Sequence, residues 1–302
     1  MNELIQRGPS TSAPALHYTL RIAAALCFIG HGAFGIITKP IWCNYFAVFG
    51  IGQELAYRMM PIVGTVDILM GISLLVYPTR AILAWLAGWG ILTAALRPLS
   101  GEPFAEMIER AGNFGVPLAL LLLSGGGGRT LRSWFTRIDP GGTGTPKDID
   151  RVKPDPHSSA PKRDTRLRAK RFDRVAVCLR IVVVLLLLGH GWLNLIGKKG
   201  LLLQYENLGF AHPAQTALFA GLFEILAALA VLVRPVRPLL FGLFLWKMAT
   251  ELFYPHWELF EWIERGGSFG SLLALWLVTR SGSNTQGRSV LIRYIRKNAG
   301  VN

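Results

Sequence analysis

The chain has 302 residues, 51% of them hydrophobic, and a formal net charge of +14. Its mean hydropathy is also positive, and soluble domains of this size rarely combine high hydropathy with high charge. Long apolar runs alternate with polar turns, and basic residues concentrate in the middle of the chain and at its C-terminus. Basic segments that flank hydrophobic spans are typical of a protein in a lipid bilayer, so we expect no nucleic-acid partner.

The apolar stretches predict an all-α integral membrane protein with eight transmembrane helices in two tandem four-helix bundles. The expected spans are, in chain order, residues 20–37, 60–77, 81–96, 107–123, 175–196, 214–233, 239–253 and 260–278. Several are shorter than the roughly 20 residues that cross the hydrocarbon layer, so we expect charged flanking residues to extend those helices.

An internal repeat relates the two halves of the chain. LRIAAALCFIGHG at residues 20–32 aligns with LRIVVVLLLLGHG at residues 179–191, and EMIERAGNFG at residues 106–115 aligns with EWIERGGSFG at residues 261–270. The offset is roughly 155 to 159 residues, and the two small deletions that it requires fall in predicted loops. We therefore expect a duplicated four-helix unit. Because four is even, both copies should have the same orientation in the membrane.

The repeat divides the chain into four parts. Residues 1–124 form the first repeat, 125–172 a flexible basic cytoplasmic linker, 173–280 the second repeat and 281–302 a basic cytoplasmic tail. Lys and Arg are enriched in the linker, in the tail and in alternate loops, which predicts that both termini are cytoplasmic. Two basic amphipathic segments, RTLRSWFTRI in the linker and SVLIRYIRK in the tail, either lie on the membrane surface or are solvated beside anionic lipid.

Several residue types limit the possible chemistry. Cys27, Cys43 and Cys178 form no CxxC pair and fall at unrelated positions of the repeats, so neither a dithiol centre nor a metal site is expected. The glycine cluster at Gly125 lacks the GK(S/T) of a nucleotide-binding loop, which disfavours ATP-driven activity. The N-terminal segment shows no cleavage signature, so the first hydrophobic span is expected to remain as a helix.

Ionisable residues recur at equivalent positions inside the predicted spans, where each costs on the order of 2.5 to 3.5 kcal/mol on insertion scales. The candidates for ligand binding or proton handling are His31, Asp67, Glu109 and Arg110 in the first repeat and His190, Glu224, Glu264 and Arg265 in the second, together with Lys247 and Glu251, which align with Gly90 and Ala94. We expect helices one, two and four of each repeat to gather its candidates in an outward-facing polar pocket.

Two interpretations of these charges stay open. They can be hydrogen-bond and ion-pair contacts that hold the helices in register. They can instead form a proton-handling site, in which a carboxylate fixes the tautomer of a histidine that titrates near neutrality. Lys247 and Glu251 are either a compensating salt bridge or a sign that only one repeat is active. His31 and His190 could also be axial haem ligands, but no other residue supports haem.

The GHG and lysine pattern resembles the DoxX-like membrane family, which includes the DoxD-type small subunit of thiosulfate:quinone oxidoreductase. The matching residues are Gly30, His31, Gly32 and Lys39, with Gly189, His190, Gly191 and Lys198 in the second copy. The resemblance covers both repeats, but family members usually have one four-helix unit, so this chain is similar to a fused dimer. It implies a bacterial inner-membrane protein in a thiol- or quinone-linked redox system, with a redox partner protein and a quinone as ligand.

The resemblance supplies no catalytic residue, and whether the protein is an enzyme stays open. A small-solute carrier or channel is one alternative, because parallel repeats and charges near the midplane are common in transporters. A noncatalytic membrane scaffold is another, in which the GHG and Glu-Arg motifs serve packing alone.

Overall fold

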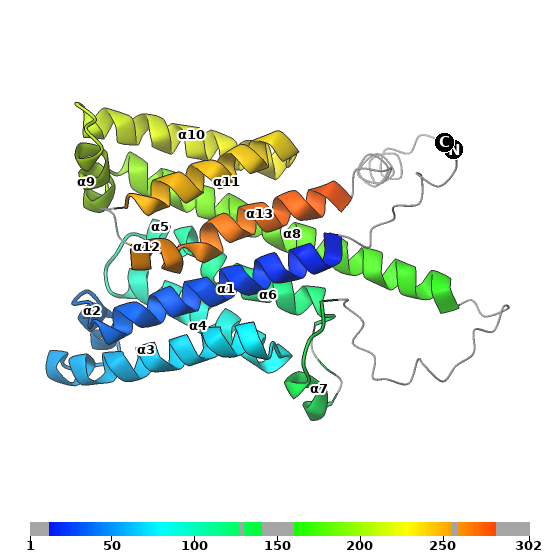
Figure 1. Ribbon diagram of the computed structural model, residues 1–302. Coiled ribbons are helices and arrows are strands. Elements are labelled where there is room, and N and C mark those ends of the chain that lie inside the picture. Colours follow the sequence, from blue (N-terminus) through cyan, green and yellow to red (C-terminus); the bar gives the residue numbers. More distant parts are fainter. Residues whose placement is uncertain (1–11, 127, 129, 141–159, 255–258, 282–302) are drawn as a thin grey trace, which may run out of the picture.

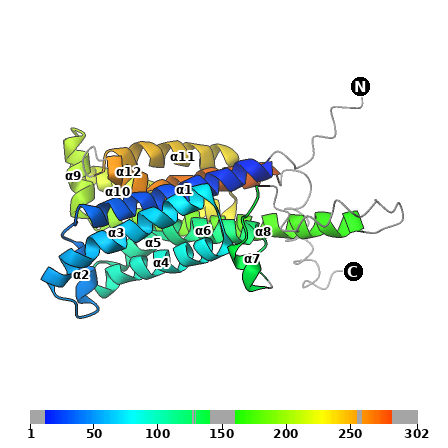
Figure 2. The ribbon, with the colours of Figure 1, turned by 60° about the horizontal axis from the view of Figure 1, so that its bottom comes forward.

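The computed structural model describes residues 12–126, 128, 130–140, 160–254 and 259–281, and within them the chain is helical and forms no strand, only an isolated β-bridge between Thr79 and Arg137. The helices are α1 (Ser12–Ile36), α2 (Trp42–Ala47), α3 (Gln53–Val76), α4 (Arg80–Leu99), α5 (Phe104–Glu109), α6 (Ala111–Leu123), α7 (Leu131–Phe135), α8 (Ala160–Leu195), α9 (Lys199–Asn207), α10 (Pro213–Val233), α11 (Arg237–Leu252), α12 (Leu259–Glu264) and α13 (Gly266–Ser281). The long helices form one bundle, with α2 and α9 at one end and α7 at the other (Figures 1 and 2).

Five described helices are long and apolar enough to cross a membrane: α1, α3, α4, α8 from residue 169 onward, and α10. Their outer faces carry large apolar side chains. On α10, for example, Phe219, Leu226 and Val233 repeat at i, i+7 spacing and are all exposed. An apolar stripe of this kind is unfavourable in water but suits contact with lipid. The chain therefore has the organisation of a multi-pass membrane protein.

The two halves of the chain are residues 12–126 and 160–281. They pack against each other through α1 and α8, and each of these helices contacts helices of both halves. Helix α1 lies against α3 of its own half and against α12 and α13 of the other (Figure 1). In the same way α8 lies against α10 of its own half and against α5 and α6 of the other. A single apolar core runs through both halves and includes Leu20, Leu120, Leu179 and Leu272.

Glycines set the closest approaches between these helices. A Cβ atom on Gly112 of α6 would lie 2.6 Å from the carbonyl carbon of Gly267 of α13, and one on Gly32 of α1 would lie 2.4 Å from the carbonyl oxygen of Gly64 of α3. No side chain fits at such distances, so each glycine permits backbone contact between the helices. Gly112 and Gly267 are aligned with each other in the repeat, so α6 and α13 cross where the halves meet.

The structure differs from the expected spans at the fourth helix of each half. The sequence predicts one continuous helix over residues 107–123 and another over 260–278, whereas the chain breaks at the arginine of each Glu-Arg pair. Arg110, with φ −86° and ψ 16°, separates α5 from α6, and Arg265 separates α12 from α13. Hydropathy alone cannot show this break, because apolar residues continue on both sides of it.

The predicted linker also contains regular structure. Helix α8 begins at Ala160, well before the expected start near Val175, and so includes the basic end of the linker. Helix α7 forms inside the amphipathic segment RTLRSWFTRI, with Leu131 and Phe135 exposed. Residues 141–159 and the tail segment SVLIRYIRK lie outside the described residues.

Candidate ligand-binding site

Each half contains a histidine bonded to a carboxylate on the neighbouring helix. His31 Nδ1 of α1 lies 2.8 Å from Asp67 Oδ2 of α3, and His190 Nδ1 of α8 lies 2.5 Å from Glu224 Oε2 of α10. Because a carboxylate can only accept, Nδ1 is the protonated nitrogen of each ring. The pairing predicted from depth along the helices is thus present, and it leaves Nε2 of each ring for other partners.

In the second half, the histidine belongs to a closed set of buried ion pairs. Lys247 Nζ of α11 lies 2.8 Å from Glu251 and 3.6 Å from Glu224. Arg265 lies 3.3 Å from Glu251 and also contacts Glu109 of the other half. Lys247 is fully buried and Glu251 is 2% exposed, so these two side chains fill the space beside His190.

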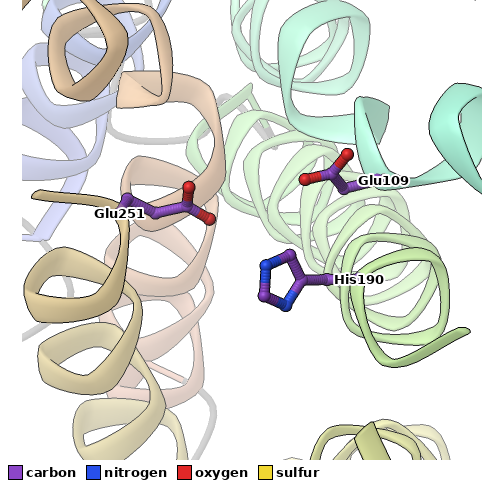
Figure 3. Close-up of side chains that lie close together, drawn as sticks. All are labelled: Glu109, His190 and Glu251. Carbon is purple, nitrogen blue, oxygen red and sulfur yellow. The ribbon is translucent and has the colours of Figure 1, made fainter. Parts of the chain in front are cut away.

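Three of these side chains could be considered for a metal ion. Glu109, His190 and Glu251 point toward one another (Figure 3), and each offers a ligand atom within 4.8 Å of the others. However, the guanidinium of Arg265 contacts both carboxylates, and Lys247 contacts Glu251 as well. Since cations of the protein already neutralise these carboxylates, we assign the cluster as an ion-pair network rather than a cation site.

The first half contains a cavity of about 130 Å³ beside His31. We call it the aromatic cavity; its lining includes Trp42, Tyr45, Phe46, Phe49, Trp89, His31, Arg97, Arg110, Asn113 and Glu264. Gly90 and Ala94, which occupy the positions of Lys247 and Glu251, bring no charged side chain into this part of the first half. The ring of His31 lies 4.7 Å from the ring of Trp42, measured between centroids.

Trp89, which lines the aromatic cavity, and Asp67, which bonds to His31, each have a polar atom without the partner that its counterpart in the second half possesses. Among the described residues, no acceptor lies near Trp89 Nε1 and no donor near Asp67 Oδ1. The equivalent Trp246 Nε1 donates to Glu224 Oε1 at 3.3 Å. Asp67 is one methylene shorter than Glu224, which accounts for the missing contact to Trp89. Buried polar groups are normally hydrogen-bonded, so these two atoms mark a difference in chemistry between the two halves.

The Glu-Arg pairs are exchanged between the halves, which corrects the expectation that each pocket is built from one repeat. A Cβ atom on Gly30 would lie 2.3 Å from the backbone nitrogen of Glu264, and one on Gly189 would lie 2.3 Å from that of Glu109. The glycine before each histidine has no side chain, and so it allows the backbone at the Glu-Arg pair of the opposite half to approach closely. Glu264 accordingly lines the first-half cavity, whereas Glu109 lies beside His190.

A second hollow of about 380 Å³, the polar vestibule, adjoins the aromatic cavity at the end of the bundle near α2 and α9. It is lined by charged side chains of both halves, namely Lys39, Arg97, Glu102, Glu106, Arg110, Lys198, Glu261, Glu264 and Arg265. Two equivalent ion pairs cross between the halves there: Lys39 to Glu261 at 2.9 Å and Lys198 to Glu106 at 2.8 Å.

The Lys198–Glu106 pair of the vestibule is ionised. Burial lowers the pKa of the Lys198 ammonium, but the Glu109 and Glu106 carboxylates and the Tyr254 hydroxyl outweigh it and raise this pKa above its usual value. Burial likewise raises the pKa of Glu106, but Arg110, Lys198 and Arg97 outweigh it and lower this pKa. Both groups therefore keep their charges near neutral pH, which suits a fixed electrostatic contact between the halves.

Sequence reasoning did not find several residues of the site. Trp42, Trp89 and Arg97 line the aromatic cavity but belong to no motif, although Trp89 aligns with Trp246 in the repeat. Trp42 belongs to α2, a short helix in a segment that hydropathy treats as a loop. The aligned tryptophans next to Gly90 and Lys247 were the available signal, because an indole among small residues often borders a cavity.

Comparison with known proteins gave no match to a family model, to a curated protein or to a solved structure.

Proposed function

We propose that the chain is a tandemly duplicated, DoxX-like protein of the bacterial inner membrane with eight spans and cytoplasmic termini. Equivalent contacts support the duplication: Arg21 Nε donates to the Leu74 carbonyl at 2.9 Å, and Arg180 Nε donates to the Val231 carbonyl at 3.0 Å. Helices α6, α11 and α13 supply the remaining spans. All three are shorter than the other spans, and α11 and α13 lie beside each other as α4 and α6 do.

In this proposal the aromatic cavity binds the single-ring head group of a quinone. The observation that carries it is the cavity itself, which combines five aromatic side chains with a histidine whose tautomer is fixed. An apolar cavity of roughly 150 Å³ holds one benzene molecule, so about 130 Å³ matches one six-membered ring. When the imidazole is protonated, His31 Nε2 can donate to a quinone oxygen, and the histidine can pass this proton to the ligand while Asp67 holds the ring in place.

The two halves then have different roles. The second half retains the histidine and carboxylate but fills the equivalent space with Lys247 and Glu251. The ion pairs of Lys247 and Arg265 with Glu251 already neutralise this carboxylate, so we assign the network a structural role. A redox partner protein would supply or remove the electrons at the first-half site.

Binding of a short-chain benzoquinone tests this proposal, because Trp42 and Trp89 line the cavity and a bound quinone should quench their fluorescence. We expect His31→Ala to weaken binding about tenfold, as a hydrogen bond and a ring contact are lost. The aligned His190→Ala is the matched control and should bind as the wild type does. Absence of binding to the wild type, or equal loss in both variants, would contradict the proposal.

A further inference from the structure

Glu264 is a buried carboxylate without a partner among the described residues. It is 6% exposed, lines both the aromatic cavity and the polar vestibule, and has no hydrogen bond or ion pair among the described residues. The aligned Glu109 instead contacts Arg110 and Arg265. The second half thus contributes a free acceptor to a cavity that otherwise belongs to the first half.

The nearby cations are directed at other carboxylates. The charged groups around Glu264 are His31, Arg110, Arg265 and Arg97. His31 Nδ1 is taken by Asp67, and the three arginines contact Glu102, Glu106, Glu109, Glu251 and Glu261. An unpaired buried carboxylate costs several kcal/mol, so a group that donates a hydrogen bond to Glu264 gains more than it would at a paired site.

Trp89, which also lines the aromatic cavity, has an unpartnered donor rather than an acceptor. Trp89 Nε1 is a buried donor with no acceptor among the described residues, and an indole nitrogen can only donate. The cavity is therefore lined by one residue with an acceptor, Glu264, and by another with an unpartnered donor, Trp89. The carbonyl oxygen of a quinone can only accept a hydrogen bond. Placed next to the Glu264 carboxylate, it would bring two acceptors together with no hydrogen between them. A hydroxyl group donates and accepts, so it can satisfy either residue.

We infer that the aromatic cavity binds the reduced, hydroquinone form of its ligand in preference to the quinone, with Glu264 accepting from one ligand hydroxyl and Trp89 Nε1 donating to a ligand oxygen. This inference rests on the proposed function, because it assigns the redox state of the same ligand. It makes the binding site composite, since the acceptor comes from the second half of the chain.

The test compares the affinities of a short-chain benzoquinone and its hydroquinone under anaerobic conditions. The wild type should bind the hydroquinone about tenfold more tightly, the effect expected for a hydrogen bond to a charged acceptor. Glu264→Gln should abolish that preference, because an amide offers a donor as well as an acceptor. Glu54→Gln, which alters an exposed carboxylate, is the control and should keep the preference.

A second variant keeps the test decisive if Glu264→Gln does not fold. Trp89→Phe retains an aromatic ring but removes the donor, so it should weaken both forms by a similar factor and preserve the preference for the hydroquinone. Equal or tighter binding of the quinone by the wild type overturns the inference while the proposed function stands. If the wild type binds neither the benzoquinone nor its hydroquinone, both the proposed function and the inference are overturned.

Discussion

His31 and His190 show how two equivalent residues acquire different surroundings. Each bonds through Nδ1 to a carboxylate of the next helix, yet one borders a cavity and the other a set of buried ion pairs. The difference traces to two positions, where Gly90 and Ala94 of the first half face Lys247 and Glu251 of the second. A few substitutions after duplication are enough to separate a binding site from a structural network.

Lys247 should therefore be essential to the stability of the second half. Lys247→Met leaves Glu224 and Glu251 buried with one cation fewer, which costs about 3 to 5 kcal/mol when a buried pair is broken. Arg58→Gln, in an exposed pair with Glu54, should cost less than about 1 kcal/mol. Thermal unfolding in detergent measures both. Similar midpoints for the two variants would show that Lys247 does not neutralise its neighbours.

Much of the residue-level site follows from the sequence, but its partners across the halves do not. The pairing of His31 with Asp67 could be predicted because depth along two antiparallel helices places both at one level. The position of Glu264 beside His31 could not, since spacing along a helix says which face a residue lies on and not which neighbour it meets. Trp89 was missed because a lone indole in an apolar helix is most often a core residue.

At the scale of helices, the glycines determine how closely the functional side chains approach. Gly32 follows His31 directly and allows α1 to contact α3 at Gly64. This contact brings the imidazole within hydrogen-bond distance of Asp67. Most helix positions were predictable from hydropathy. The breaks at Arg110 and Arg265 were not predictable, because apolar residues continue on both sides of each break. Helices α2 and α9 were not predictable either, because they are short.

Gly32→Ala should separate α1 from α3 and disturb the site. The added methyl group would meet the Gly64 carbonyl oxygen at 2.4 Å, and overpacking of this kind costs about 1 to 3 kcal/mol. Gly88→Ala on α4 is the matched control, because a Cβ atom there meets nothing within 4 Å. We expect the first variant to lower the unfolding midpoint and the second to leave it unchanged or raise it. The opposite order would refute the close contact as a determinant of stability.

At the scale of the whole molecule, the two halves form one unit rather than two bundles joined by a linker. The Lys39–Glu261 and Lys198–Glu106 pairs cross between them, and α6 and α13 touch at Gly112 and Gly267. The sequence predicts the repeat as two tandem domains, but the exchange of fourth helices depends on packing between segments far apart in the chain. The linker therefore joins halves that already bury a common core.

The central claim is that one ring-sized ligand site exists in the first half and that its equivalent in the second half is filled. Photolabelling with a photoreactive single-ring benzoquinone, followed by peptide mapping, tests this claim most directly. We expect label within residues 42–49 or 89–96, lost in the presence of excess unlabelled quinone, and none above background within residues 246–253. Equal, competable labelling of residues 246–253 would contradict it, because Lys247 and Glu251 would then not exclude a ligand.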